Sequence, residues 1–288
     1  MPLFRRLWSE QVVTPVGLIH WLESQPERAA MQAWVAEEGD ELVAFANARF
    51  RWSLEEPGIG GLWVGVLPEH RRRGLATSLY ELAEEHLLSR DASRLGSTVR
   101  EDEEDGRRFA KRRGYQESRT EQYWALDVQP DAAPPSPPDG VKVVRLAEML
   151  SRERDLFELY DAADRDMPDD HVHTMEFDDW KRDTLDNPEL DTELSSVVLV
   201  GDQPASFAWL ISDRGGRRAM NEMTGTAPEF RRRGLARLAK QSAIRWAAEA
   251  GIQRILTSND STNADMLALN QHLGYRPAVR RISVSKEV

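Results

Sequence analysis

One short sequence occurs twice in the chain, and this internal repeat limits the folds that the protein can adopt. Residues 64–76 read VGVLPEHRRRGLA and residues 224–236 read TGTAPEFRRRGLA, so nine of thirteen positions are identical. The same offset of 160 residues relates Gly114-Tyr115 to Gly274-Tyr275. A duplication at constant offset indicates two copies of one structural unit. We therefore expect two similar domains in the 288 residues.

The stretch from residue 127 to 140 (DVQPDAAPPSPPDG) lies between the two copies. Its five prolines in a polar context predict an extended connector. The predicted division is an N-terminal domain over residues 1–128, a linker over 129–140 and a C-terminal domain over 141–288. The front half of the first copy is about twenty residues shorter, because Gly74 lies 73 positions after Met1 whereas Gly234 lies 93 positions after Val141.

Hydrophobic periodicity predicts the same order of strands and helices around each repeat. In the first copy we expect a hairpin over residues 30–48 with its turn at 38–40, a strand at 60–67, a helix from Leu75, a strand at 94–99 and a helix at 106–113. In the second we expect strands at 141–146, 195–200, 205–212, 219–226 and 253–258, with helices at 152–163, 177–185, 235–250 and 264–273. Strand, turn and helix thus surround each arginine-rich segment, and the fold class is mixed α/β.

Each arginine-rich segment follows a strand and opens a helix, and this arrangement predicts an anion site. The unpaired amides and the dipole of a helix N-terminus both favour negative charge. Gly74 and Gly234 allow a ligand to approach the backbone closely. A basic, solvated helix start is the alternative for one such segment, but the duplicated context favours a binding turn.

The spacing Arg-x-x-Gly-x-Ala after a strand and a proline resembles the pyrophosphate-binding signature of the GNAT superfamily of N-acetyltransferases. Both copies carry it, so the chain resembles tandem GNAT proteins, a layout that mycothiol synthase also has. In the second copy Thr257, Asn259, Asn263, Met266 and Asn270 with Leu273-Gly274-Tyr275 resemble a pattern of actinobacterial tandem GNATs. The resemblance implies two domains, each a mostly antiparallel, centrally splayed mixed sheet flanked by helices.

The resemblance also implies acetyl-CoA as cosubstrate and a set of residues that bind it. In the second copy these are Met223, Thr224, Thr226, Arg231, Arg232, Arg233, Gly234, Leu235, Ala236 and Asn263. In the first copy they are Val64, Val66, Arg71, Arg72, Arg73, Gly74, Leu75 and Ala76. Asn263 lies where many GNATs place an asparagine that bonds the pantetheine arm, and it is equally suited to cap a helix beginning at Ala264.

Both copies depart from the family at the positions used for catalysis. Ala110 and Asn270 stand where many members carry a tyrosine acid, and Glu103 replaces the pantetheine asparagine in the first copy. Thr98 and Ser258 stand where some members have a glutamate base. No catalytic pair is therefore transferred from the family.

Glu222 is the candidate base that the sequence itself suggests. Strand alternation predicts its side chain on the same side as Thr224 and Thr226, and its counterpart at the repeat offset is Leu62. A surface carboxylate, or one that pairs with an arginine, is an equally open interpretation. Deprotonation through water, or an amine already partly neutral, would make a dedicated base unnecessary.

The front half of the second copy is rich in acidic residues and is where we expect the amine acceptor. These are Asp161, Asp164, Asp166, Asp169, Asp170, Asp178 and Asp179, with Phe177 and Trp180 among them. Such acidity attracts a cationic amine, although a solvated acidic surface is the simpler interpretation. His171 and His173 lack further placed ligands, so we expect no metal.

The net charge and the absence of cysteine exclude several classes of binding partner and of reaction. The net charge of −11 argues against nucleic-acid and anionic-membrane partners. The absence of cysteine excludes disulfides, thiolate metal ligands and an acyl-cysteine intermediate. No apolar run is long enough for a membrane span and no signal peptide is recognisable, which favours the cytoplasm.

The resulting expectation is an acetyl-CoA-dependent N-acetyltransferase that transfers the acetyl group directly to a primary amine of a small molecule or peptide. We expect the chemistry in the C-terminal domain, since the first copy has a shortened front half and carries Glu103. Two alternatives stay open. Both domains could act in sequence on one molecule, or the protein could be an acyl-CoA-binding sensor or assembly module without transferase activity.

Overall fold

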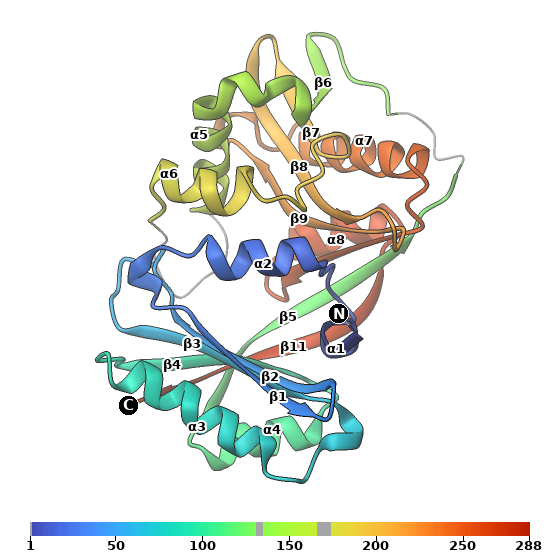
Figure 1. The fold of residues 1–288 in the computed structure, drawn as a ribbon. Coiled ribbons are helices and arrows are strands. Elements are labelled where there is room, and N and C mark those ends of the chain that lie inside the picture. Colours follow the sequence, from blue (N-terminus) through green and yellow to red (C-terminus); the bar gives the residue numbers. More distant parts are fainter. Residues whose placement is uncertain (1, 131–134, 166–173) are drawn as a thin grey trace. The chain divides into compact units, whose positions relative to one another are not determined.

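The computed structural model describes residues 2–130, 135–165 and 174–288, which form two compact units (Figure 1). The first unit contains residues 2–122 together with Val279–Val288. The second contains the described residues from Tyr123 to Ala278. Each copy of the repeat therefore supplies most of one unit, but the last strand of the chain ends in the first unit.

The first unit is a mixed sheet with helices on both faces. Its helices are α1 (Pro2–Leu7), α2 (Pro15–Glu23), α3 (Leu75–Leu88) and α4 (Glu104–Arg112), with 3₁₀ turns at Glu27–Ala29 and Pro68–His70. Its strands are β1 (Gln32–Glu38), β2 (Glu41–Phe50), β3 (Ile59–Val66), β4 (Arg94–Arg100), the beginning of β5 (Gln116–Asp127) and most of β11 (Arg276–Glu287). β1, β2 and β3 pair antiparallel, β3 pairs parallel with β4, and β4 pairs antiparallel with β11.

The second unit repeats this arrangement with a longer front half. Its helices are α5 (Glu153–Asp164), α6 (Phe177–Trp180), which continues as a π-helical turn at Lys181–Leu185, α7 (Leu235–Glu249) and α8 (Ala264–His272), with 3₁₀ segments at Leu146–Arg152 and Pro228–Phe230. Its strands are β6 (Val141–Arg145), β7 (Ser196–Val200), β8 (Gln203–Asp213), β9 (Arg218–Thr226) and β10 (Arg254–Asp260). β6 to β9 pair antiparallel in order, and β9 pairs parallel with β10.

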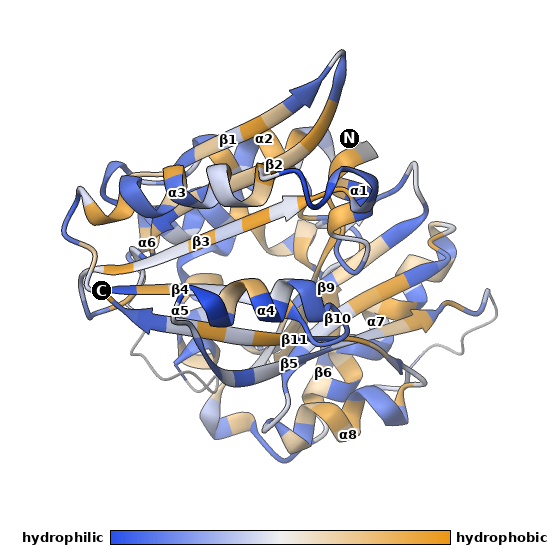
Figure 2. Cartoon of the chain, turned by 90° about the horizontal axis from the view of Figure 1, so that it is seen from below, coloured by the Kyte–Doolittle hydropathy of each residue, from blue (hydrophilic) through white to orange (hydrophobic). Residues whose placement is uncertain are grey.

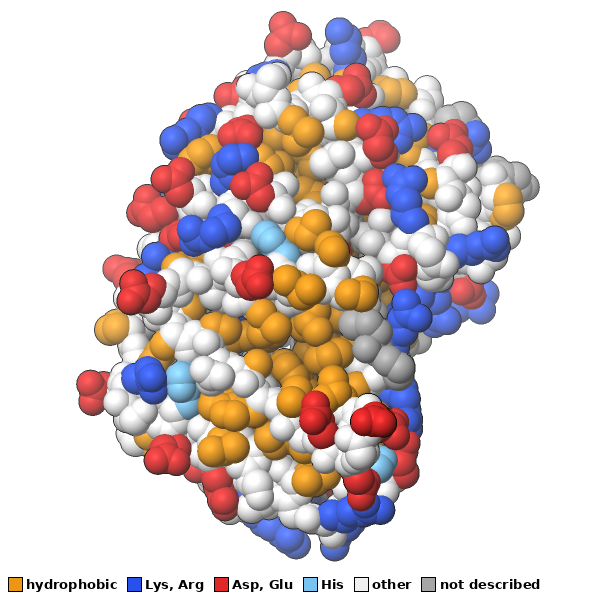
Figure 3. All heavy atoms as spheres, in the orientation of Figure 1, with side chains coloured by type: hydrophobic (Ala, Val, Ile, Leu, Met, Phe, Trp, Pro, Cys, Tyr) orange, Lys and Arg blue, Asp and Glu red, His pale blue; other side chains and the backbone are white. Residues whose placement is uncertain are grey.

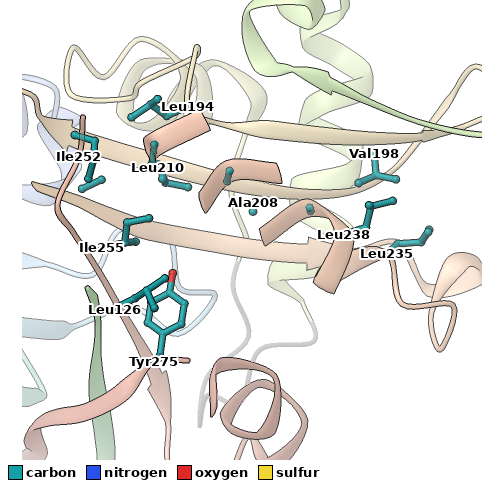
Figure 4. Close-up of a cluster of buried hydrophobic side chains, with 14 of the residues drawn as sticks. Leu126, Leu194, Val198, Ala208, Leu210, Leu235, Leu238, Ile252, Ile255 and Tyr275 are labelled. Carbon is teal, nitrogen blue, oxygen red and sulfur yellow. The ribbon is translucent and has the colours of Figure 1, made fainter. Parts of the chain in front are cut away.

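Two apolar clusters cover the two faces of the second sheet. On one face, α7 packs Leu235, Leu238 and neighbouring alanines against Val198, Leu210 and other strand residues (Figure 4). On the other, α5 and α6 pack around Trp180, Phe207 and Trp209. Burial of both faces explains why β7 and β8 read as nearly continuous apolar runs.

The sequence analysis assigned no strand to residues 116–127 or 276–287, yet both are long strands that complete the units. In the first unit β11 pairs with β4 from Arg281↔Arg100 to Glu287↔Arg94. In the second unit Trp124 and Leu126, near the end of β5, join the core beside Tyr275. β5 is polar and charged before Tyr123, and β11 carries charges along most of its length, so long-range pairing decides their conformation.

The other predicted elements agree with the structure to within a few residues, and each unit is a mixed sheet as expected. α1 and α2 were not assigned from the sequence. Acidic and basic side chains are interspersed over the visible face (Figure 3). No helix among the described residues has both the length and the apolar character needed to cross a membrane. The domain boundary at the Pro-rich segment remains a prediction.

Candidate functional site

The central strands of each sheet separate where the repeated sequence begins. β3 pairs with β4 over residues 59–61, and β9 pairs with β10 over residues 218–221. The following residues, 62–66 and 222–226, have no register with the parallel neighbour in these described strands. Their backbone groups on that side are consequently available to a ligand inserted between the strands. The splay inferred from the family resemblance is thus present in both units.

A glycine in each splayed strand allows a neighbouring side chain to pack onto the backbone. A Cβ at Gly65 would meet the Trp63 ring at 2.3 Å, and a Cβ at Gly225 would meet the Ala163 Cβ at 2.4 Å. Both contacts are shorter than real Cβ atoms allow. The glycine shared by both repeats therefore fixes the packing behind the opened strand.

The arginine-rich turn has the same backbone in both units. Arg72 and Arg232 adopt positive φ angles of 66° and 60°, and Gly74 and Gly234 precede their helices at 85° and 76°. Nothing lies within 4 Å of a Cβ built on Gly74 or Gly234, so the space beside each helix N-terminus is open. This geometry suits a bound diphosphate.

The three arginines of each turn differ in role. The Nε atoms of Arg71 and Arg231 donate to the carbonyls of Val66 and Thr226, each at 3.1 Å, and thereby close the turn onto the splayed strand. Arg72 and Arg232 are exposed, and Arg73 pairs with Glu38 at 2.9 Å. Arg233 lies 5.6 Å from the centre of the Phe230 ring. The first arginine is therefore part of the scaffold.

In the first unit the predicted residues line a cavity of about 640 Å³. Seven of the eight predicted residues of this copy lie on its wall, namely Val64, Val66, Arg71, Arg72, Gly74, Leu75 and Ala76. Arg108, Arg112 and Arg113, on α4 and just beyond it, add positive charge, and α4 is largely hydrophilic (Figure 2). The cavity thus combines an apolar strand with a cationic rim.

Buried charged side chains lie at the strand side of this cavity. Arg281, which also lines it, donates from Nε to Glu10 at 2.7 Å and from a terminal nitrogen to the Thr98 hydroxyl at 3.3 Å. Both Arg281 and Glu10 are buried. Thr98, at the position of a base in some GNATs, is therefore bonded to an arginine of the last strand. The sequence analysis missed Arg281 because strand β11 was not recognised.

Asn263 and Glu103 serve different partners. The Asn263 side chain accepts a hydrogen bond from the Met266 amide at 3.2 Å and so caps α8. Glu103 at the start of α4 instead accepts from Arg71 at 3.1 Å, and its side chain makes no cap. In the first unit an acidic group therefore partly neutralises the arginine turn, whereas the second unit has a neutral amide at that position.

The opened strands of the two units differ by a β-bulge at Glu222. Trp209 pairs with Met223 and Leu210 pairs with Asn221, so Glu222 is an extra residue in β9. β3 runs opposite β2 without interruption from residue 60 to 66. Glu222 is exposed, whereas its neighbours Asn221 and Met223 are buried. Bulges re-aim side chains and are frequent beside active sites.

The bulge corrects two inferences made from the sequence. Gly61 pairs with Gly96 and Met220 pairs with Leu256, so register makes Asn221 the counterpart of Leu62 and leaves Glu222 without one. The predicted alternation with Thr224 also fails, because the bulge inserts a residue between the two sides. Thr224 donates to the Asn221 side chain at 2.9 Å, while the charge of Glu222 acts on Tyr160 of α5.

Three carboxylates surround Tyr160 on the α5 side of the second sheet. The pKa of the Tyr160 hydroxyl is raised, first by burial and then by the charges of Asp164, Asp183 and Glu222. The Tyr160 ring stacks on Phe207 and Trp209 at 5.9 Å and 5.6 Å. The fold therefore brings Glu222 close to the acidic front half. Asp183 was missed because it lies in a helical segment with no distinctive motif.

The remaining acidic and aromatic residues of the front half have other roles. Asp161 pairs with Arg165 at 2.6 Å, and Asp179 pairs with Arg182. Asp178 is exposed. Trp180 is buried in the core, and the Phe177 ring lies 3.6 Å from the guanidinium carbon of Arg154. Asp166, Asp169, Asp170, His171 and His173 lie outside the described residues.

Asn270 and Ala110 are both buried, at the positions of the missing tyrosine. The Asn270 Nδ2 donates to the Asn259 Oδ1 at 2.6 Å, which ties α8 to the end of β10. The amide has no readily transferable proton at neutral pH. Across residues 2–130, 135–165 and 174–288, no cluster of three metal-ligating side chains occurs.

A buried lysine lies behind the bulge of the second unit. Lys240 on α7 is 1% exposed, and burial lowers the pKa of its amine to about 7. Its Nζ donates to the Asn221 Oδ1 at 2.7 Å. Tyr80 occupies the same helix position in the first unit. A lysine inside the apolar stripe of α7 was the sequence signal that could have revealed this residue.

Comparison with known proteins identifies the fold of both copies. The model of the acetyltransferase (GNAT) family matches residues 2–115 and 155–275. A tandem GNAT protein from the clavulanic acid biosynthesis pathway superposes with a TM-score of 0.77 at 19% identity, over 99% of this chain and 92% of that one. No similar protein was found among curated sequences.

Two further solved structures have the same fold. A GCN5-related N-acetyltransferase from Sphaerobacter thermophilus gives a TM-score of 0.71 at 20% identity, over 88% of this chain and 80% of that one. One from Kribbella flavida gives 0.56 at 15% identity, over 96% of each chain. At these identities the similarity establishes the fold alone.

Proposed function

The chain belongs to the acetyltransferase (GNAT) family, and on that premise we propose that it is an acetyl-CoA-dependent N-acetyltransferase with its chemistry in the second copy. The observation that carries the proposal is the bulge at Glu222, which directs a carboxylate out of the opened strand and toward the acidic front half. The first copy has no equivalent residue in register.

The second copy has the parts needed to hold acetyl-CoA, which supplies the acetyl group as a thioester. The open α7 N-terminus at Gly234, with Arg232 and Arg233, suits the diphosphate. Residues 223–226 of the splayed strand would offer backbone groups to the pantetheine arm and to the carbonyl oxygen. Asn263, at the start of α8, would contact the arm beside them.

Glu222 would accept the proton of the attacking ammonium, either directly or through one water molecule. The amine nitrogen then bonds to the carbonyl carbon, the carbon–sulfur bond breaks, and the second proton that the nitrogen loses passes to the departing sulfur or to water. A thiol of ordinary pKa, about 8.5, can leave as the thiolate without a dedicated acid. The replacement of the tyrosine by Asn270 is therefore compatible with transfer.

The acceptor that best fits this region is a small molecule or peptide with a cationic amine. Asp164, Asp183 and Glu222 place negative charge around Tyr160. Such a field concentrates cations and orients an ammonium group toward the base. Tyr160 stacks on the buried rings of Phe207 and Trp209 behind these charges, which holds it in place.

Product formation tests the proposal directly. The intact protein is incubated with acetyl-CoA and a panel of diamines, aminoglycosides and peptide N-termini, and mass spectrometry detects acetylated amine. We expect a product from a cationic primary amine, with equimolar release of free CoA. Tight CoA binding without product across the panel would instead favour the acyl-CoA-binding sensor, which the missing tyrosines and the cavity of the first unit support.

A further inference from the structure

The side chain of Asn221 is bonded on both sides of the bulge in β9. Its Nδ2 donates to the carbonyl of Trp209 at 3.0 Å, on the opposing strand β8, and to the carbonyl of Met223 at 2.9 Å, beyond the bulge. A bulge interrupts the ladder and leaves backbone groups to be satisfied in another way. Here the side-chain amide of Asn221 satisfies the two carbonyl groups.

The oxygen of the same amide receives two donors. Lys240 Nζ approaches Oδ1 at 2.7 Å and the Thr224 hydroxyl donates at 2.9 Å. An asparagine side chain has two N–H donors and two oxygen lone pairs, so all four capacities of Asn221 are used. The Thr257 hydroxyl of β10 also donates to the Asn221 backbone carbonyl at 3.0 Å. Asn221 is thus fixed from β8, β9, β10 and α7.

Lys240 makes one orientation of this amide far more favourable than the other. If the amide were flipped, its NH₂ group would face the donors of Lys240 and Thr224, and its oxygen would face two carbonyls. The Thr224 hydroxyl could rotate and accept instead, but the contacts with the Lys240 amine and with the two carbonyls would be unfavourable, which costs several hydrogen bonds in a low-dielectric interior. The Tyr275 ring, 5.2 Å from Nζ, covers the other side of the lysine.

The first unit has a different arrangement at these positions, and its strand has no bulge. Leu62 occupies the register position of Asn221 and joins the apolar cluster with Tyr80. The Tyr80 hydroxyl donates to Glu84 at 2.7 Å and lies 3.4 Å from the hydroxyl of Tyr115. An apolar residue on the strand thus accompanies a regular ladder, and an asparagine bonded to lysine accompanies a bulge.

We propose that Lys240 is a positioning residue for acetyl transfer: through the Asn221 amide it holds the bulge that turns Glu222 out of the strand. Lys240 itself touches neither substrate in this assignment. The buried amine acts from the far side of the sheet, through one side chain, on the backbone that carries the base. This inference rests on the proposed function for its catalytic consequence, but its structural part can be measured without turnover.

The test compares the wild type with Lys240→Met, Asn221→Leu and the double variant in the full-length chain. Asn221→Leu leaves a buried amine without its acceptor and is expected to be the least stable of the four. The double variant replaces the polar pair with apolar groups like those of the first unit and is expected to regain stability. If the double variant is stable, a loss of activity in it comes from the changed geometry of the bulge and not from unfolding.

Activity and backbone exchange are then measured on the stable proteins. A misplaced base lowers kcat about 10- to 100-fold, while the KM for acetyl-CoA stays within about twofold because the α7 N-terminus is intact. Hydrogen exchange at residues 221–224 is expected to change in Lys240→Met and in the double variant. Ser242→Ala, which removes a buried hydroxyl of the same helix that donates to the Leu238 carbonyl at 3.0 Å, is the matched control that should leave both kcat and this exchange unchanged.

The outcomes separate the two claims. A double variant with wild-type kcat and wild-type exchange would overturn the role of Lys240. A wild type without product on the amine panel would remove the proposed function, and the exchange measurement would still decide whether Lys240 holds the bulge. Loss of kcat together with altered exchange in the stable double variant supports the proposal.

Discussion

The two copies share a backbone turn and differ in what surrounds it. Both have the splayed strands, the closing arginine and the open helix N-terminus at Gly74 or Gly234. The first copy has the defined cavity, in which Glu103 binds Arg71 and Arg281 covers Thr98. The second has the bulge, Glu222 and the acidic front half. The features that both copies share and the features found in one copy are therefore separable within one fold.

The largest effect is expected for Glu222→Gln. A glutamine cannot accept the ammonium proton, so kcat should fall on the order of 100- to 1000-fold, as for loss of a general base. Steady-state kinetics at saturating acetyl-CoA and amine measures this change. Glu193→Gln, which removes an exposed carboxylate elsewhere in the same unit, is the control and should keep kcat. A variant Glu222→Gln with more than half of the wild-type kcat would assign the proton to water.

The next largest effect, on kcat/KM for acetyl-CoA, is expected for Gly234→Val, and Gly74→Val is the matching change in the first copy. Each puts a β-branched residue at a positive φ, near 76° or 85°, and places a side chain where the diphosphate would approach. Loss of the charge-assisted hydrogen bonds to the diphosphate costs about 3 kcal/mol, so kcat/KM for acetyl-CoA should fall about 100-fold in Gly234→Val, while the strain lowers the stability of the fold.

Gly74→Val should leave turnover within about twofold, because the proposed chemistry takes place in the second copy. An interaction lost in the first copy is then not one that stabilises the transition state. Isothermal titration with CoA should nevertheless show weaker binding to the first unit. If Gly74→Val alone abolished turnover, the assignment of chemistry to the second copy would be reversed.

Because the amine of Lys240 is buried, we expect the free energy of unfolding to depend on pH. The first copy has Tyr80 at this position and lacks such an amine. The pKa of Lys240 is about 7 in the fold and 10.5 in the unfolded chain, so between these values the unfolded state binds more protons. Stability therefore rises with pH across this window, by about 2 kcal/mol between pH 7 and 9. Urea unfolding of the wild type and Lys240→Met at both pH values measures the difference.

The variant Lys240→Met should lack this rise, whereas Lys142→Met, which removes an exposed lysine of β6, should keep it. Equal pH dependence in wild type and Lys240→Met would mean that the amine keeps an ordinary pKa. The hydrogen bond to Asn221 would then still form, but its donor at pH 7 would be a charged ammonium group.

The smallest effect is expected for Asn263→Ala set against Glu103→Ala. Asn263→Ala removes a helix cap and the proposed pantetheine contact, and the loss of about 1 kcal/mol from that contact should raise the KM for acetyl-CoA about fivefold. Glu103 makes no cap, and Glu103→Ala frees Arg71 from its carboxylate. CoA should then bind the first unit more tightly, without a change in kcat. Weaker binding in Glu103→Ala would show that Glu103 orients Arg71 for the ligand.

The sequence by itself determined the features of each repeat that depend on neighbouring residues. Each turn from Pro68 to Ala76 and from Pro228 to Ala236 depends on glycine and on a strand followed by a helix, and neighbouring residues specify these. The duplication, the backbone of the arginine-rich turn and the helix at Asn263 were therefore predictable. Arg71 and Arg231 were expected to help at the diphosphate, and the structure adds their bonds to the strand.

Tertiary structure decided what depends on register between distant segments. A bulge cannot be read from alternation, because Glu222 became an extra residue only through the pairing of Asn221 with Leu210 and Thr257. The same holds for β5 and β11, whose polar sequences become strands through their long-range partners. The repeat thus supplied the arginine-rich turn, and the pairing of strands placed the bulged Glu222 and the buried Lys240 in the second copy alone.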